Sequence, residues 1–427
     1  MLRFIAAYGI ICVHTKMQAE ERMKDILRSD KLMLVHSDIR GPVFQEALKM
    51  EKAGEKVLKL NTGNPGKFGF GLPDSIRNAL EGHLDEAVAY CDLKGMPNAR
   101  AAIKAYHEST GIEHVDENNI FIGNGVSEVV SMLTTAFLNS SDEILVPCPC
   151  YSIWPNCTYI AGAVPVHYTC DEKANWYPDV DDIKKKITPR TRAILIINPN
   201  NPTGAVYPRE ILEQIADIAR EHDLAIFSDE IYDRLVMDGI THTPMASVAP
   251  DLLVVTMNGL SKSHIICGFR CGWMVITGPT EKAKDFIEGI VALASMRLCS
   301  NALMQLVIPA ALEDKASTEA MMVPGGRLFE PREAACRAMD ESRELTYVKN
   351  RAAFYMFPKF DAQKHNITDD RKFAYDLLKA KKILIVPGSG FDYMTPDHFR
   401  IVMLPEPDEL YRAMAEISDF LETYKQN

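Results

Sequence analysis

The chain has 427 residues, of which 47% are hydrophobic and 25% are charged, and its formal net charge is −11. This length and composition are typical of a globular protein with two or three domains, and they exclude a small secreted framework held by disulfides. The negative net charge argues against a groove for nucleic acid.

The first 30 or so residues read as a ragged N-terminal extension. The stretch MLRFIAAYGIICVH is apolar, but it is too short to span a bilayer and lacks a clean cleavage site. Met17 and Met23 are alternative starts. The ten cysteines are scattered, and Cys148-Pro149-Cys150 has no matching histidine or cysteine pair. We therefore expect no metal site, no membrane contact and a reducing, cytoplasmic environment.

The middle of the chain alternates strands and helices. Apolar runs predict five strands, over Asp142–Val146, Ala193–Ile197, Leu224–Ser228, Leu252–Met257 and Trp273–Ile276. Ile211, Ile215 and Ile218 form the apolar stripe of a helix that runs from Pro208 to about Glu221. Strand, helix and strand in this order favour right-handed crossovers and a largely parallel sheet.

The C-terminal third predicts a second, smaller α/β domain. Phe354–Phe357, Ile383–Val386 and Phe399–Leu404 read as strands, and Asp408–Tyr424 reads as an amphipathic helix. The two parts are expected to be joined by residues from about 30 to 75.

Polar side chains follow three of the central strands, where ligands of open α/β sheets collect. The segment NPNNPTG (Asn198–Gly204) follows one strand, Asp229 follows the next, and a loop with Ser261 and Lys262 follows a third. Each feature alone is more simply a turn, a cap or a surface lysine. Together they match pyridoxal phosphate, which needs a lysine for its Schiff base and an acid facing its pyridine nitrogen.

The phosphate of such a cofactor needs a site of its own. A Gly-containing turn leads into a predicted helix over about Ser127–Leu138, and helix N-termini bind phosphate through free N–H groups. Gly125, Val126 and Ser127 would cradle the phosphate, and Arg270 would supply the countercharge. Asn201 and Tyr232 could both donate to the phenolic oxygen of the ring.

From about residue 38 onward, the chain resembles the class I (fold type I) aminotransferases. The resemblance rests on NPNNPTG, SDEIYD, SKSHIICGFRCGW and HFRIVMLP, and further segments such as SDIRGPV and LASMRLCSN are most like the alanine aminotransferase branch. It implies an α/β fold with a large domain around a mostly parallel sheet and a smaller α/β domain built from both chain ends. We expect an extension over 1–30, an arm and part of the small domain over 31–75, the large cofactor-binding domain over 76–310 and the small domain over 311–427.

The resemblance also implies residue roles toward the cofactor. Lys262 is then the Schiff-base lysine and proton carrier, and Asp229 pairs with the pyridine nitrogen. The remaining cofactor contacts are expected from Gly125, Val126, Ser127, Tyr151, Asn201, Tyr232, Ser261 and Arg270, and from Tyr90 of a neighbouring subunit in a homodimer.

Substrate recognition is implied in the same way. Arg400 matches the arginine that grips the α-carboxylate, and Gly63 and Asn201 line the pocket. We expect Arg40, or alternatively Arg297, to bind the second carboxylate of glutamate or 2-oxoglutarate.

The expected reaction is ping-pong transfer of an amino group, with alanine as donor and 2-oxoglutarate as acceptor. A broad aspartate/aromatic aminotransferase and a C–S lyase on the same fold are alternatives, and a non-catalytic cofactor-binding regulator is disfavoured because Lys262 is intact. Five residues depart from the family pattern: Gly259, His264, Cys267, Asn350 and Ala352.

Overall fold

The computed structural model describes residues 26–427, and the boundary between its two units falls between Leu34 and Val35. The predicted extension over 1–30 therefore lies almost wholly outside the described residues, as do Met17 and Met23. The described part of the first unit contains one short 3-10 helix, η1 (Asp30–Met33).

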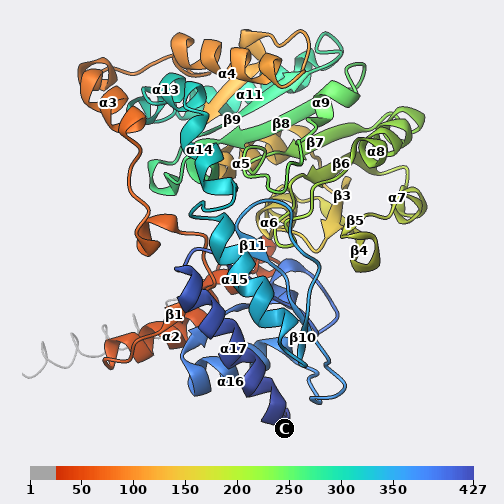
Figure 1. Ribbon diagram of the computed structural model, residues 1–427. Helices are drawn as coiled ribbons and strands as arrows, with labels where there is room; N and C mark the ends of the chain where they lie inside the picture. Colours follow the sequence, from red (N-terminus) through yellow and green to blue (C-terminus); the bar gives the residue numbers. More distant parts are fainter. Residues whose placement is uncertain (1–25) are drawn as a thin grey trace, which may run out of the picture. The chain divides into compact units, whose positions relative to one another are not determined.

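An eight-stranded sheet forms the centre of the second unit, in the order β2-β9-β8-β7-β6-β3-β4-β5 (Figure 1). Its strands are β2 (Ile120–Gly123), β3 (Glu143–Cys148), β4 (Val164–Asp171), β5 (Tyr177–Pro178), β6 (Thr191–Ile197), β7 (Ala225–Asp229), β8 (Val254–Gly259) and β9 (Gly272–Thr277). The five predicted strands are confirmed to within two residues at each end, while β2, β4 and β5 were not predicted. Within this order, β8, β7, β6 and β3 each run parallel to the next strand. In contrast, β9 runs antiparallel to both β8 and β2.

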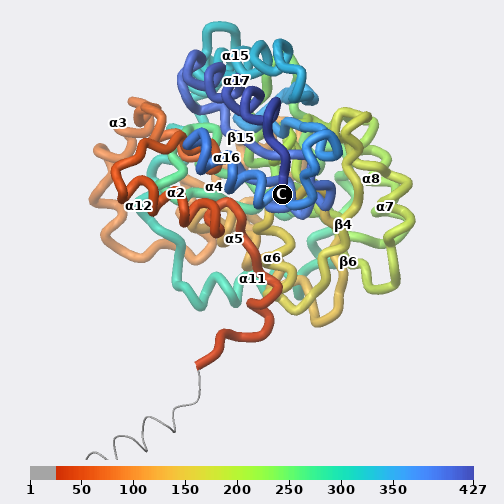
Figure 2. The backbone as a smooth tube through the Cα atoms, turned by 90° about the horizontal axis from the view of Figure 1, so that it is seen from below, coloured from red at the N-terminus to blue at the C-terminus, as the bar shows by residue number. Residues whose placement is uncertain are grey.

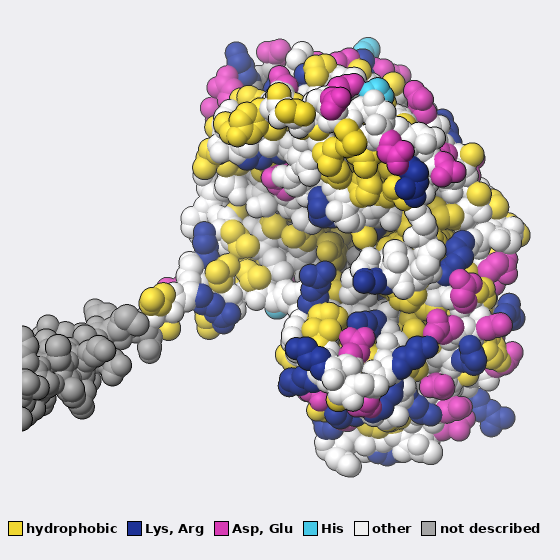
Figure 3. Space-filling model, turned by 90° about the vertical axis from the view of Figure 1, so that its left-hand side faces the viewer, with side chains coloured by type: hydrophobic (Ala, Val, Ile, Leu, Met, Phe, Trp, Pro, Cys, Tyr) yellow, Lys and Arg dark blue, Asp and Glu magenta, His cyan; other side chains and the backbone are white. Residues whose placement is uncertain are grey.

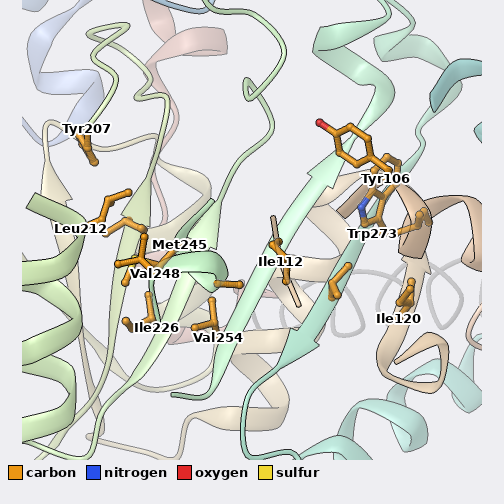
Figure 4. Packing of buried hydrophobic residues seen from close by; sticks show 14 of the residues in the cluster. Tyr106, Ile112, Ile120, Tyr207, Leu212, Ile226, Met245, Val248, Val254 and Trp273 are labelled. Carbon is orange, nitrogen blue, oxygen red and sulfur yellow. The ribbon is translucent and has the colours of Figure 1, made fainter. Parts of the chain in front are cut away.

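Helices cover both faces of the sheet because its strands are apolar on both sides. Ile194 and Ile196 of β6 face one buried cluster, and Leu195 between them faces the other. The first face carries α4 (Pro97–Ser109), α8 (Arg209–Glu221), α9 (Met245–Val248) and α13 (Ile308–Glu313), and the second carries α5 (Val126–Phe137), α6 (Ile153–Ile160) and α11 (Lys284–Met296). Figure 4 shows Leu212 of α8 and Met245 of α9 packed near Ile226 and Val254 of the sheet.

The C-terminal part builds a separate cluster around short strands. In it, β11 (Tyr355–Met356) and β14 (Val386–Pro387) both pair antiparallel with β15 (Phe399–Val402). Around them lie β10 (Leu345–Thr346), β12 (Lys359–Phe360), α15 (Phe329–Asp340), α16 (Asp370–Lys381) and α17 (Pro407–Thr423). Thus the predicted C-terminal strands and helix are confirmed, with the run Ile383–Val386 divided between two short strands.

A segment from near the start of the unit joins this C-terminal part. The strand β1 (Leu58–Lys59) pairs in parallel with β13 (Ile383–Leu384), and α2 (Pro42–Lys52) packs against α16, as Figure 2 also shows. The remaining helices are α3 (Asp74–Gly82), α7 (Val180–Lys186), α10 (Leu260–Ser263), α12 (Ala302–Gln305) and α14 (Ala316–Met322).

Acidic and basic side chains lie interspersed on the face in Figure 3, so the net negative charge is not gathered into one patch there. Between residues 26 and 427, none of the helices combines the length and the apolar character that crossing a bilayer needs.

Candidate active site

Three strand ends meet at one edge of the central sheet, as the sequence predicts. The register places Ile197 of β6 opposite Asp229 of β7, and Asp229 opposite Met257 of β8. Because Asn198 follows β6 directly, and α10 with Lys262 follows β8, amide, carboxylate and amine groups share this edge. The local reason is that polar residues come at or directly after the C-terminal end of each of these apolar strands.

A cavity of about 620 Å³ opens at this edge. Its lining includes most of the predicted site residues, namely Arg40, Gly63, Val126, Ser127, Tyr151, Asn201, Asp229, Tyr232, Ser261, Lys262, Arg270 and Arg400. Tyr90 and Arg297 lie elsewhere: the Tyr90 side chain is 80% exposed, and the Arg297 guanidinium donates to Glu128 at 3.1 Å and to the Ile122 carbonyl at 2.8 Å.

Lys262 projects from α10 into the cavity. Its Nζ donates to the Gly63 carbonyl at 3.4 Å and lies 5.5 Å from the centre of the Phe354 ring. A Cβ on Gly259, at the end of β8, would lie 2.6 Å from the Cys271 carbonyl oxygen. A side chain at this position would therefore collide with β9 in the present arrangement of the two strands.

Asp229 is buried at the end of β7, with 4% of its surface exposed. Trp154 Nε1 donates to Oδ2 at 3.0 Å, and the Ile231 amide donates to Oδ1 at 3.4 Å. Burial raises the pKa of Asp229 to about 6, against the opposing influence of these two hydrogen bonds and of Lys262. Such a desolvated carboxylate suits a partner that carries a positive charge or a proton, as a pyridinium nitrogen does.

The residues predicted to bind a phosphate lie at the start of α5, beside Arg270. Gly125 precedes the helix with φ 84°, and a Cβ at this position would collide with the Arg270 guanidinium. Arg270 itself is held by a hydrogen bond from Nη1 to the Cys267 carbonyl at 2.9 Å. Free N–H groups of the first helical turn thus lie beside a cation, as an anion site requires, so the residues fit the phosphate of the expected cofactor.

Arg400 lies on β15, lines the same cavity and is 1% exposed. Its Nη1 donates to Asn201 Oδ1 at 3.3 Å, Nη2 donates to the Asn61 carbonyl, and Nε has no partner. The guanidinium lies between two aromatic rings, 4.5 Å from Tyr355 and 4.9 Å from Phe391. Burial lowers the pKa of Arg400, although the nearby tyrosines oppose this shift. A buried guanidinium with free N–H groups is suited to bind a carboxylate.

Sequence reasoning missed three residues of this site: Tyr355, Trp154 and Asn61. Tyr355 lies in the apolar run AAFYMFP and reads as one more core residue of a strand. Trp154 reads as core for the same reason. Asn61 lies in LNTGNPGKFGF, a segment that resembles the alanine aminotransferase branch but that gave Asn61 no role. A polar atom inside an otherwise apolar run was the one available signal, because buried hydroxyl and indole N–H groups need a partner.

The other departures from the family pattern support the loops of the site. His264 is buried, and its ring nitrogens bond to Ser263 Oγ at 2.8 Å and to the Ala311 carbonyl at 2.5 Å. Burial lowers its pKa to about 4, so the ring stays neutral and anchors α10 to α13. Cys267 lines the cavity, and Asn350 and Ala352 pack against Gly204 after β6.

Comparison with known proteins agrees with this geometry. The family model for aminotransferase class I and II matches residues 55–417. The chain is 50% identical to the glutamate-pyruvate aminotransferase AlaA of Haemophilus influenzae over 93% of this chain and 99% of that protein. It is 44% identical to an alanine aminotransferase of Mycobacterium bovis over 96% of this chain and 95% of that protein. The crystal structure of an aminotransferase from Escherichia coli superposes with a TM-score of 0.93 at 48% identity, over 95% of this chain and all of that one.

Proposed function

Since the chain belongs to the family of class I and II aminotransferases, we propose that its substrates are alanine and 2-oxoglutarate, which exchange an amino group by a ping-pong mechanism. Membership of this family makes the protein a fold type I enzyme that depends on pyridoxal phosphate and acts on amino acids and 2-oxo acids. One observation carries the proposal: Lys262, Asp229 and the buried Arg400 line a single cavity.

Lys262 and Asp229 would act at different atoms of the cofactor. When bound, pyridoxal phosphate supplies a carbonyl carbon that bonds amines and a ring that takes up electrons. Lys262 would hold the cofactor, and its free amine would carry the proton that leaves the substrate Cα. Asp229 would keep a proton on the ring nitrogen, because a buried carboxylate without a cation is unfavourable.

The other lining residues would orient the cofactor. Tyr151 would stack on its ring, while Asn201 and Tyr232 would bind its phenolic oxygen. The first turn of α5, with Gly125, Val126 and Ser127, would hold the phosphate together with Ser261 and Arg270.

Arg400 would bind the α-carboxylate that all substrates share, beside Gly63 and Asn201. We assign the second carboxylate of glutamate and 2-oxoglutarate to Arg40. Two observations favour Arg40 over Arg297: Arg40 is exposed and lines the cavity from η2 (Asp38–Arg40), and Arg297 is already paired with Glu128 outside the cavity.

We also propose that the enzyme is a homodimer in which Tyr90 reaches the phosphate of the neighbouring subunit. Hydrophobic side chains at least half exposed flank it on two segments, Leu84 and Val88 on one and Met296 and Leu298 on the other. The Cys91 thiol lies 4.0 Å from the Ser300 carbonyl, so the two segments are neighbours. Exposed apolar patches of this kind favour protein association.

Two further assignments remain proposals. The pairing of β1 with β13 supports a small domain formed by 31–75 and 311–427, beside a large domain over 76–310. The unpaired cysteines among the described residues favour a cytoplasmic location.

The test is to follow the two half-reactions separately. Alanine should convert the cofactor to pyridoxamine phosphate and release pyruvate, and 2-oxoglutarate should restore it.

Arg40→Ala should weaken the glutamate and 2-oxoglutarate half-reaction at least tenfold more than the alanine and pyruvate one, since a hydrogen bond to a charged group contributes about 1.5–3 kcal/mol. Equal losses in both would refute the role of Arg40, and ammonia release from a sulfur amino acid would favour a lyase.

A further inference from the structure

Asn61 joins the two segments that carry the arginines assigned to the substrate. It lies two residues after β1 and is fully buried. Its backbone carbonyl accepts a hydrogen bond from Arg400 Nη2, and its side-chain Nδ2 donates to the Ile39 carbonyl at 2.7 Å. Ile39 is the residue before Arg40 in η2. Asn61 therefore contacts the arginine of β15 through its main chain and the helical turn of Arg40 through its amide.

The main chain before Asn61 is held on both sides. The Leu60 amide donates to the Leu384 carbonyl at 2.9 Å, and the Leu60 carbonyl accepts from the Val402 amide at 3.0 Å. Val402 is the last residue of β15, the strand that carries Arg400. Because its backbone is bonded to this strand, the Asn61 amide has a fixed position relative to the Arg400 guanidinium.

The Asn61 amide is poorly suited to a purely structural role. Its Oδ1 is buried and has no hydrogen-bond partner among residues 26–427. A buried amide loses its hydration, and a single hydrogen bond offsets only part of this cost. An apolar side chain of similar size would therefore serve folding at least as well here. The bond to Ile39 is better explained by the neighbouring Arg40, which lines the cavity.

We propose that Asn61 is a positioning residue that sets the distance between Arg400 and Arg40, so that the pocket selects a five-carbon dicarboxylate. The inference rests on the roles proposed above for the two arginines, with Arg400 at the α-carboxylate and Arg40 at the second carboxylate. Alanine has one carboxylate and needs only Arg400. Glutamate and 2-oxoglutarate need both arginines at a set separation, so they depend on the Asn61 side chain and alanine does not.

Binding of unreactive carboxylates to the full-length enzyme loaded with pyridoxal phosphate tests this separation without amino transfer. Glutarate has the carbon skeleton of glutamate but no amino or oxo group, adipate is one carbon longer, and propionate has a single carboxylate. Asn61→Ala removes the amide but keeps the backbone carbonyl that accepts from Arg400. Asn156→Ala is the matched control, because Asn156 Nδ2 also donates to a carbonyl of the N-terminal segment, that of His36 at 2.7 Å, but from α6 and not from the backbone that holds Arg400.

Calorimetry gives the dissociation constants. In the parent, glutarate should bind at least about tenfold more tightly than propionate or adipate, and Arg40→Ala should remove most of this advantage. Asn61→Ala should weaken glutarate binding about 3- to 10-fold, the effect of one ordinary hydrogen bond, and leave propionate within about twofold. In the Arg40→Ala background it should cause no further selective loss, since it acts through Arg40. Asn156→Ala should leave the preference for glutarate unchanged.

Three results would overturn the inference: equal weakening of glutarate and propionate by Asn61→Ala, a selective loss that adds to that of Arg40→Ala, or the same selective loss in Asn156→Ala. If Asn61→Ala does not fold, Asn61→Ser gives the same test, because its hydroxyl is one bond shorter and falls short of the Ile39 carbonyl. Glutarate affinity unchanged in Arg40→Ala would refute the role of Arg40 and the inference with it. A glutarate preference that Asn61→Ala removes, in an enzyme that does not react with alanine, would support the inference and refute the proposed donor.

Discussion

Replacement of Arg400 by lysine tests the recognition of the α-carboxylate most directly. Two of its N–H donors are used by Asn201 and Asn61, and Nε is buried without a partner. A substrate carboxylate can thus be met by a planar fork of two hydrogen bonds, which one ammonium cannot reproduce. Loss of one charged hydrogen bond costs about 1.5–3 kcal/mol, or about 10- to 150-fold in affinity. The substitution also removes the contacts of the Arg400 guanidinium with the rings of Tyr355 and Phe391, and this loss adds to the cost.

We therefore expect Arg400→Lys to lower kcat/KM about 100-fold for alanine and for glutamate alike, because both carry the same α-carboxylate. Stopped-flow measurement of each half-reaction, with the cofactor absorbance as signal, gives both values. Arg327→Lys is a suitable control, since this arginine also stacks on an aromatic ring, Phe70 at 4.5 Å, and donates to the Leu404 carbonyl, but does not line the cavity. A loss confined to glutamate, or an equal loss in the control, would refute the assignment.

Three other predictions concern the cofactor end of the site and the core behind it. Borohydride reduction followed by peptide mapping should place the cofactor on Lys262, and Lys262→Ala should abolish this attachment; a cofactor found on another lysine would contradict the assignment. Asp229→Asn keeps the shape but removes the charge, so single-turnover rates should fall at least about 100-fold while cofactor still binds; near-normal rates would argue against pairing with the ring nitrogen. Glu230 is buried and accepts hydrogen bonds from Ser228 at 2.7 Å and from the Met245 amide at 3.0 Å, and burial raises its pKa to about 8. Its folded-state pKa exceeds the unfolded value, so its stabilising contribution is complete at low pH and is lost as the pH rises through about 8. Glu230→Gln should remove this loss, so the urea unfolding midpoints at about pH 5 and about pH 9 should differ less in the variant than in the parent, and an identical pH dependence would disprove the shift.

The sequence by itself determined the class of the fold and which polar side chains lie at one edge of the central sheet. Apolar runs, turn residues and helix periodicity are local features, and they predicted the five central strands, α8, α5 and α17 to within a few residues. Since parallel strands end at the same edge, Asn201, Asp229 and Lys262 could be assigned to one site without a structure. The motif order added the family, and with it the cofactor.

Only the tertiary structure decided which distant segments meet. Pairing of β1 with β13 and of β11 with β15 depends on hydrogen bonds between chain segments that carry no mutual signal in the sequence. The same holds for the antiparallel direction of β9 and for the contact that requires glycine at position 259. These long-range contacts bring Tyr355, Arg400 and Lys262 into one cavity. Hydrophobic pattern specifies which face of a strand is buried, but the partner that covers it is chosen by packing of the whole chain.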